Sequence, residues 1–415
     1  MFKYYSISFF LVWFIICIFL AFLGSGVLIF GGDSVVVSEY LIFDSMSFYL
    51  ILLVLLLGLY SQSFFFTFLS SEVRGFLFLS LFFSIMCFCV NHAIIFWCFY
   101  ELSMLPLLYL IFKESPYSER FLAGWYFACY LLVTSLPLIL FLLYLSMVNN
   151  TCILSEWNSD SASVWIFIIL SFVFFTKVPL VPFHTWLPIV HAEATSIVSI
   201  FLSGYIMKLG LLGVYRCSYF IFDSCLFTYL FVCFVISIFF FITAASELDG
   251  KRWLAFLSLA HITVPFLAFF ISDCGGINYS FFYCLGHGLS AGIVFGLLWY
   301  FYDMSNSRNW LLLKSSINCK SGIFLVVLSL LSLCSFPPTI QFFCEVSLIK
   351  ISADSFVYLL FWCIYLFFGG LVPLILCGHL LIRSEWSESY SCDNFNYFNF
   401  LFFLCFWCYV GLVIL

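Results

Sequence analysis

Residues 174–186 read FFTKVPLVPFHTW and close an almost unbroken apolar run. The run resembles a lipid-facing helix, yet it carries Lys177 and two prolines, Pro179 and Pro182. A charged group is costly in hydrocarbon, and proline removes a backbone donor that lipid cannot replace. The segment therefore either lies outside a membrane or is a broken span whose lysine has a function.

The composition decides between these alternatives. The 415-residue chain is 65% hydrophobic and 8% charged, with a mean hydropathy of +1.20. Soluble domains carry about 25% charged residues, so a soluble fold is excluded. The 19 cysteines are scattered singly through apolar segments. We expect them to pack as small apolar side chains, without a disulfide framework or a metal site.

Apolar runs separated by short charged loops predict an all-α polytopic membrane protein with about 13 transmembrane helices. Residues 1–415 then form a single membrane domain, because no stretch is long enough for a soluble domain. The predicted spans are 7–30, 46–69, 75–91, 93–112, 121–146, 163–187, 195–216, 226–247, 251–272, 276–302, 321–349, 355–382 and 394–415, the last being a C-terminal transmembrane helix.

The basic residues support this number of spans and predict the orientation. Basic residues favour the cytoplasmic or matrix side of a membrane. With these spans, Arg216 and Lys350 fall on one side and ten basic residues on the other, which places the N-terminus inside. The ten are Lys3, Arg74, Lys113, Arg120, Lys251, Arg252, Arg308, Lys314, Lys320 and Arg383.

Two predicted spans are interrupted by prolines. Pro179 and Pro182 break the span 163–187, and Pro337 and Pro338 break the span 321–349. Each broken span is the fourth of a five-span group, 75–216 or 226–382. Since five is odd, the two groups would cross the membrane in opposite senses, as inverted repeats. Paired broken helices in inverted repeats indicate an ion site near the midplane of a transporter.

Ionisable residues inside the predicted spans are the candidate functional residues. Glu101 lies in the middle of its span, and Lys177 lies at the break of another. A buried Glu–Lys pair can exchange a proton as it opens and closes. The alternatives are a carboxyl kept protonated by its surroundings and a lysine that snorkels from a helix end.

Lys208 lies too deep in its span to snorkel, and Gly204, Gly210 and Gly213 around it allow close helix packing. His261 and His287 lie near the centres of their spans. Histidine titrates near neutrality, so these two are candidate proton relays, unless they are hydrogen-bonded core residues.

Glu345 follows the double-proline break and falls on the downstream half-helix, unless it lies near the membrane surface. His184, His191 and Glu193 could suggest a metal site, but the neighbouring prolines and tryptophan favour an interfacial turn. We find no phosphate-binding loop, iron–sulfur cysteine cluster or nucleophile elbow. We therefore expect no cofactor in this chain.

Five segments of this sequence resemble the antiporter-like membrane subunits of respiratory complex I, which are related to subunits of multisubunit Na⁺/H⁺ antiporters. The resemblance covers roughly residues 46–382. The segments are FYELSMLPLL (99–108), TKVPLVPFHTWLPIVHAEA (176–194), IMKLGLLGVYR (206–216), DGKRWLAFLSLAHI (249–262) and GHGLSAG (286–292).

The resemblance implies a role for each candidate residue. It implies that Glu101 pairs with Lys177, that Lys208 is the central lysine, and that His261 and His287 are relays. Glu345, in PPTIQFFCEVS (337–347), stands where two branches of the family have lysine and one has glutamate. The chain departs from the family in lacking one N-terminal span of the usual fourteen, and in having Asp-Gly-Lys (249–251) for Asp-Leu-Lys.

The expected function is proton translocation, driven by NADH oxidation and ubiquinone reduction in other subunits of complex I. The resemblance implies a mitochondrial inner-membrane location, FMN and iron–sulfur clusters in partner subunits, neighbouring antiporter-like subunits, and lipids such as cardiolipin as partners. It implies no nucleic-acid partner. The alternatives are a subunit of a multisubunit Na⁺/H⁺ antiporter and a structural spacer without transport.

Overall fold

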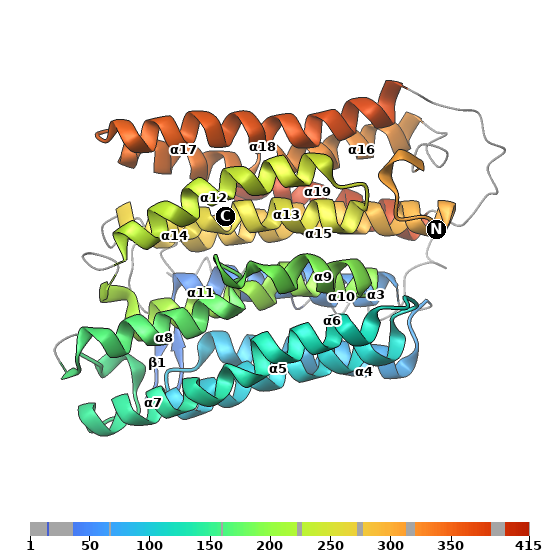
Figure 1. The fold of residues 1–415 in the computed structure, drawn as a ribbon. Coiled ribbons are helices and arrows are strands. Elements are labelled where there is room, and N and C mark those ends of the chain that lie inside the picture. Colours follow the sequence, from blue (N-terminus) through green and yellow to red (C-terminus); the bar gives the residue numbers. More distant parts are fainter. Residues whose placement is uncertain are drawn as a thin grey trace.

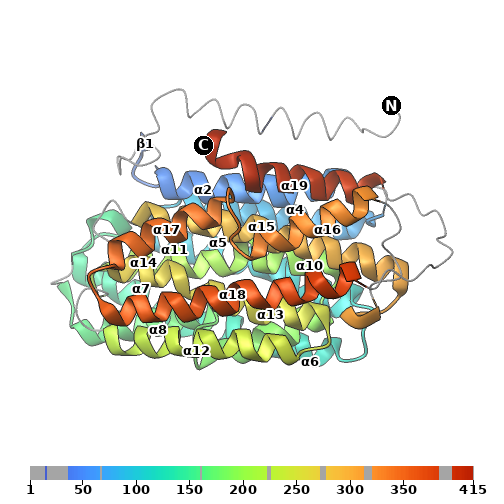
Figure 2. The same ribbon diagram turned by 90° about the horizontal axis from the view of Figure 1, so that it is seen from above.

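The structure is a computed structural model that describes Ile15 and residues 36–65, 68–158, 161–221, 226–271, 277–312, 320–382 and 395–414. Long helices lie side by side in a bundle, running in alternating directions (Figures 1 and 2). A two-stranded antiparallel hairpin, β1 (Val36–Val37) and β2 (Ile42–Phe43), precedes the first described span.

Nine spans are continuous in the described residues, and three of these contain a π-helical turn. The three are α2–η2–α3 (Ser45–Val54, Leu55–Leu59, Tyr60–Phe64), α6–η3–α7 (Arg120–Phe127, Ala128–Val133, Ser135–Asn149) and α10–η7–α11 (Ser196–Phe201, Leu202–Ile206, Met207–Ser218). The others are α4 (Ser71–Cys89), α5 (Ala93–Glu114), α12 (Phe227–Ser246), α15 (Ile277–Ser305), α18 (Phe356–Ile382) and α19 (Phe395–Ile414).

Three further spans are interrupted. They are α8 (Val164–Lys177) with α9 (Trp186–Glu193), α13 (Gly250–His261) with α14 (Thr263–Ile271), and α16 (Lys320–Leu333) with α17 (Ile340–Ser352). Short 3₁₀ turns lie at Leu154–Glu156, Phe183–Thr185 and Tyr219–Ile221.

The predicted membrane fold is confirmed. Ten helices among the described residues are long and apolar enough to cross a membrane, and α8 and α16 add shorter apolar helices. All predicted spans from 46–69 onward coincide with these helices. The first, 7–30, lies outside the described residues except for Ile15, so the total stays a prediction. The inverted relation of the two five-span groups also stays a prediction.

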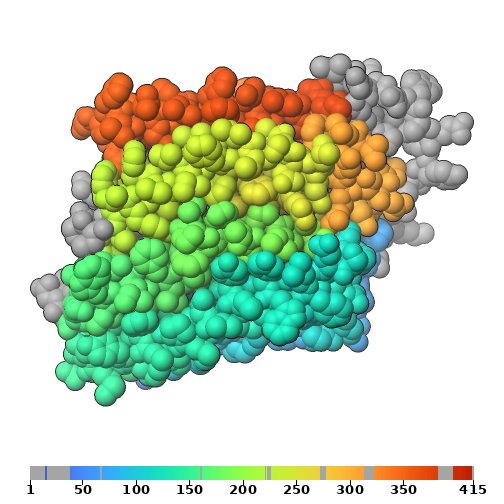
Figure 3. All heavy atoms as spheres, in the orientation of Figure 1, coloured from blue at the N-terminus to red at the C-terminus, as the bar shows by residue number. Residues whose placement is uncertain are grey.

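Helix α15 lies at the centre of the bundle. It packs against α2, α10, α13, α14, α16, α17 and α19. The most apolar stretches of α10–α11 and α15 are fully buried, whereas only 39% of the residues in those of α4, α12 and α18 are buried. The first group of spans and the second occupy neighbouring bands of the molecule (Figure 3). The buried central spans are the ones that carry Lys208, His261 and His287.

The first break frees backbone carbonyls that must find other donors. Helix α8 ends at Lys177, two residues before Pro179. The indole of Trp186 donates to the Thr176 carbonyl at 3.0 Å, and the Tyr229 hydroxyl donates to the Val181 carbonyl at 2.6 Å. These bonds satisfy groups that a continuous helix would have paired, which is how a broken helix is tolerated at membrane depth.

Changing Trp186 to Phe should destabilise the fold at this break. Trp186 is fully buried, and its loss as a donor leaves the Thr176 carbonyl unpaired, at a cost of about 1–3 kcal/mol. We expect a lower midpoint of thermal inactivation for the purified assembly. Trp165→Phe is the matched control, because Trp165 lies on the same broken span but is 73% exposed. Equal midpoints for the two variants would contradict this account.

The other two interruptions also follow from proline. Thr339 caps α17 after the double proline, accepting a hydrogen bond from the Phe342 amide. The α13–α14 interruption falls directly after His261 and was not predicted. Its cause is Pro265, which has no N–H to donate to the His261 carbonyl four residues earlier.

Candidate functional site: a buried row of ionisable side chains

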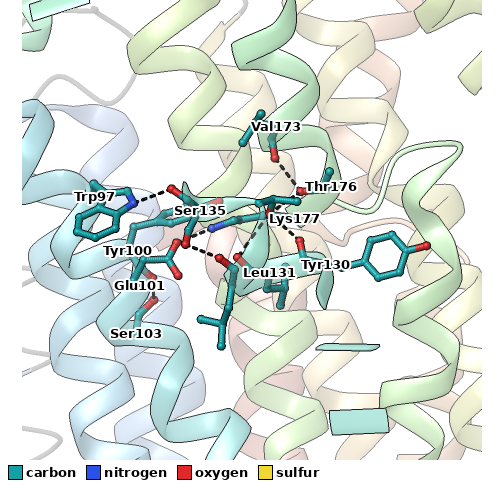
Figure 4. A network of polar contacts seen from close by, with 12 residues as sticks. Trp97, Tyr100, Glu101, Ser103, Tyr130, Leu131, Ser135, Val173, Thr176 and Lys177 are labelled. Carbon is teal, nitrogen blue, oxygen red and sulfur yellow. Dashed lines mark hydrogen bonds and ion pairs between the residues drawn. The ribbon is translucent and has the colours of Figure 1, made fainter. Parts of the chain in front are cut away.

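Glu101 and Lys177 form the predicted ion pair. Lys177 Nζ lies 2.6 Å from Glu101 Oε1, and both side chains are buried. They reach one another from α5 and α8 (Figure 4). The Lys177 ammonium also lies 4.0 Å from the centroid of the Tyr100 ring, a cation–π contact with the neighbour of its own partner. Because the two side chains pair inside the bundle, Lys177 does not snorkel to a helix end and Glu101 is not an isolated carboxyl.

Residues around this pair connect its helices. The Trp97 indole on α5 donates to the Ser135 carbonyl at the start of α7, at 3.1 Å. Thr176, next to Lys177, donates to the Thr134 hydroxyl at 3.2 Å. Figure 4 shows Trp97, Ser135 and Thr176 around the pair. The pair is therefore held by contacts from three spans.

Lys208 is buried without a carboxylate partner. Its Nζ donates to the Ser203 carbonyl at 2.5 Å and lies 3.1 Å from His287 Nδ1. The Ser203 carbonyl belongs to the π-helical turn η7 just before the lysine, and such turns are frequent at functional sites. None of the ion pairs in the described part of the chain includes Lys208. A buried ammonium with only neutral partners is weakly stabilised, so its charged form is disfavoured relative to a lysine that has a carboxylate partner.

His287 and His261 continue the row from Lys208. Their ring centroids are 5.7 Å apart, and both side chains are buried. The Nε2 atom of each ring has no hydrogen-bond partner among the described residues. Each ring therefore has one nitrogen hydrogen-bonded and one without a partner among the described residues, and the role of the two histidines as proton relays stays a prediction.

Glu345 ends the row as the distal carboxylate. It is 2% exposed, so its carboxyl lies inside the helix bundle. Its Oε1 accepts from Ser335 in the second break at 2.9 Å, from Tyr283 at 3.3 Å and from Gln341 at 3.4 Å. The second break thus contributes directly to the surroundings of the carboxylate, as the first break does for Lys177.

Three residues in contact with His261 were not predicted from the sequence, and we call them the His261 cluster: Tyr365, Tyr283 and Gln341. Tyr365 Oη lies 2.8 Å from His261 Nδ1, and Tyr283 Oη and Gln341 Nε2 each lie 3.3 Å from the same atom. A sequence signal existed for two of them: Tyr283 stands four residues before His287, and Gln341 four before Glu345. Residues four apart share a helix face, so each faces the row with its predicted neighbour.

The segment 184–193 differs from the prediction of an interfacial turn. Residues Trp186–Glu193 form helix α9, and His191 is fully buried with its ring stacked on Phe295 at 4.9 Å. A helix is compatible with these prolines because Pro188 falls in the first turn of α9, where its missing N–H leaves no hydrogen bond unmade. His184 lies before this helix, in the 3₁₀ turn Phe183–Thr185.

Glu193, at the end of α9, takes part in an ion-pair cluster. Arg308 Nη1 lies 3.2 Å from Glu193 Oε1, and Arg308 Nε lies 3.5 Å from Asp249 Oδ2. Lys251 belongs to the Asp-Gly-Lys motif (249–251), which differs from the Asp-Leu-Lys of the family. It donates to the Ala194 carbonyl at 2.8 Å. The cluster joins the end of α9 to the start of α13 and to the segment that follows α15.

The comparisons with known proteins agree with this geometry. The family described as NADH:quinone oxidoreductase/Mrp antiporter, transmembrane, matches residues 90–371. This range includes all six ionisable residues of the buried row: Glu101, Lys177, Lys208, His287, His261 and Glu345. The chain belongs to this family of membrane subunits.

Individual relatives of this chain carry the name of one particular subunit within the family. NADH-ubiquinone oxidoreductase chain 4 of Locusta migratoria is 30% identical over 314 residues, covering 72% of this chain and 68% of the relative. The protein of the same name from Acanthamoeba castellanii is 31% identical over 270 residues, covering 62% of this chain and 54% of the relative.

Solved structures of a respiratory complex I and of an Mrp complex contain chains with the same fold. A chain of respiratory complex I from Thermus thermophilus gives a TM-score of 0.79 at 18% identity, covering 89% of this chain and 81% of that one. A chain of the Mrp complex from Dietzia sp. DQ12-45-1b gives 0.78 at 17% identity, covering 93% and 76%. At such identities the likeness concerns the fold alone.

Proposed function

We propose that this chain is the chain 4-type membrane subunit of NADH:ubiquinone oxidoreductase and translocates protons. The observation that carries the proposal is the buried row of Glu101, Lys177, Lys208, His287, His261 and Glu345. Intramembrane ionisable residues that face one another mark ion or proton paths. The identity to the Locusta chain 4 supports the choice of this complex within the family.

In this mechanism the Glu101–Lys177 pair sets the charge near Lys208. While the pair is closed, its two charges compensate each other. When it opens, the Lys177 ammonium is no longer balanced, and repulsion favours loss of the proton from Lys208. His287 Nδ1, 3.1 Å from Lys208 Nζ, is placed to accept that proton. His261 and then Glu345 carry it onward, towards the intermembrane space.

The redox chemistry belongs to other subunits of the assembly. We propose that FMN and iron–sulfur clusters lie in those partners, and that this chain contributes to the enzyme only through proton transfer. The sequence contains none of the motifs that would hold such groups. The chain would receive its driving force as a change in the state of the Glu101–Lys177 pair.

The proposed location is the mitochondrial inner membrane, with the N-terminus and most basic residues on the matrix side. The outer faces of the bundle are apolar: Leu140 and Met147 on α7, and Phe356 and Phe367 on α18, are more than 60% exposed. We propose that neighbouring antiporter-like subunits and lipids, including cardiolipin, cover these faces. Surfaces of this kind need an apolar environment.

A subunit of a multisubunit Na⁺/H⁺ antiporter is the second candidate. It is favoured by the likeness to the Mrp chain, whose fold this chain shares to nearly the same degree. That candidate uses an ion gradient in place of redox energy. It predicts proton movement that depends on Na⁺ and needs no NADH.

The composition of the native assembly distinguishes the two. We expect purification of the assembly containing this chain to yield a large complex with FMN and iron–sulfur centres. Reconstituted in vesicles, that complex should move protons on addition of NADH and a ubiquinone, at the same rate with and without Na⁺. A small assembly lacking redox centres, with Na⁺-dependent proton movement, would overturn the proposal in favour of the antiporter.

A further inference from the structure

The last step of the row has no direct contact. In the described residues no hydrogen bond joins His261, at the end of α13, to Glu345 on α17. Both side chains contact the hydroxyl of Tyr283 on α15 instead: Tyr283 Oη lies 3.3 Å from His261 Nδ1 and 3.3 Å from Glu345 Oε1. All three side chains are buried.

We infer that Tyr283 is the proton relay between His261 and Glu345, an inference that rests on the proposed proton-translocating function. A phenol hydroxyl is one donor and one acceptor on the same atom, so it can pass a proton between two neighbours. Tyr283 is thereby a catalytic residue of proton transfer, because its oxygen contacts both reacting groups.

The other two side chains of the cluster cannot take this part. Gln341 Nε2 contacts both His261, at 3.3 Å, and Glu345, at 3.4 Å, but an amide nitrogen only donates and has no lone pair to accept a proton. Tyr365 contacts His261 at 2.8 Å, and no hydrogen bond joins it to Glu345 among the described residues.

Gln341 and the close approach of α15 and α17 position the relay. Gln341 Nε2 donates to Tyr283 Oη at 3.0 Å, which occupies a lone pair and directs the phenolic hydrogen towards Glu345. The two helices can approach so closely because position 286 is glycine: a Cβ there would lie 3.0 Å from the Gln341 backbone nitrogen. Gln341 is therefore a positioning residue.

The transfer balances without any further reactant. In the starting state His261 is an imidazolium and Glu345 a carboxylate. The N–H bond at Nδ1 of His261 breaks as its proton moves to Tyr283 Oη, and the Tyr283 O–H bond breaks as its proton moves to Glu345 Oε1. The products are a neutral imidazole, a regenerated phenol and a protonated carboxyl. Tyr283 ends unchanged and never carries a net charge if the two protons move together.

The test is Tyr283→Phe in the assembled complex, reconstituted in vesicles. The substitution removes one oxygen and keeps the ring. We expect NADH-driven proton translocation to fall by about tenfold or more, because a positioned proton-transfer group commonly contributes 10²–10⁴ to the rate. Tyr205→Phe is the matched control: it also removes a fully buried hydroxyl, but one whose partner is Ser80 at 2.8 Å, so translocation should change less than about twofold.

A spectroscopic measurement adds a readout that a structural role would not move. The carbonyl stretch of protonated Glu345 can be assigned by infrared difference spectroscopy as the band absent from Glu345→Gln. Tyr283→Phe removes a donor to that carboxyl and should shift the band to higher wavenumber, whereas Tyr205→Phe should not. Full translocation with an unshifted band in Tyr283→Phe would overturn the relay.

Lys208→Met, measured alongside, separates this inference from the proposed function. If Lys208→Met loses translocation while Tyr283→Phe retains it, the relay is wrong and the proton-translocating function stands. If both variants translocate normally, the proposed function fails as well.

Discussion

Changing Lys208 to Met should lower NADH:ubiquinone turnover of the coupled complex by about 10- to 100-fold, since it removes a proton-transfer group from the centre of the row. Methionine keeps the length and apolar stem of the lysine, so α11 should still insert and pack. The rate of NADH oxidation with ubiquinone as acceptor is the measurement, at equal amounts of assembled complex.

Lys350→Met is the control for this substitution. Lys350 lies near the end of α17 and is exposed, so its loss should leave turnover unchanged. A Lys208→Met complex that assembles fully and turns over at the rate of Lys350→Met would contradict a central role for Lys208.

Breaking the Glu101–Lys177 pair from one side should destabilise the subunit strongly, whereas removing both charges should destabilise it less. Glu101→Gln leaves a buried ammonium unbalanced, and Lys177→Met leaves a buried carboxylate; each loss typically costs about 3–5 kcal/mol. The double variant leaves neither charge. We expect it to recover assembly, measured as the thermal stability of the purified complex, but to stay inactive in coupled turnover.

The exposed pair Lys113–Glu72 provides the comparison. It also joins two neighbouring spans by an ion pair, but its side chains are 43% and 61% exposed. Solvent screens such a pair, so Lys113→Met should have no measurable effect on stability. If Glu101→Gln and Lys177→Met were equally harmless, the buried pair would have no role in stability. If the double variant also pumped normally, it would have none in transport.

The spans and the ionisable row were accessible from the sequence because both follow from the cost of placing polar groups in hydrocarbon. Lys177, Lys208 and Glu345 stand out in helices that are otherwise apolar, and prolines mark two of the breaks. That Glu101 meets Lys177 came from the resemblance and from charge, and the 2.6 Å contact confirms it.

The rest of the site depends on which faces meet across the bundle. With 24 tyrosines in the chain, the spacing of four residues before His287 is a weak signal for Tyr283, and nothing in the sequence distinguishes Tyr365 from tyrosines that face lipid. Their role appears only when α13, α15, α17 and α18 are packed together. The interruption after His261 could have been predicted from Pro265, but one proline in an apolar run is a weaker signal than the pairs that mark the other two breaks.

The most direct test of the central claim is the number of protons moved per electron in the Lys208→Met complex, compared with the unmodified complex in the same vesicles. Because the row is proposed to conduct protons through Lys208, the account predicts that whatever turnover remains moves fewer protons for each NADH oxidised. An unchanged ratio in the variant would mean that the protons take another path, and that this buried row does not conduct them.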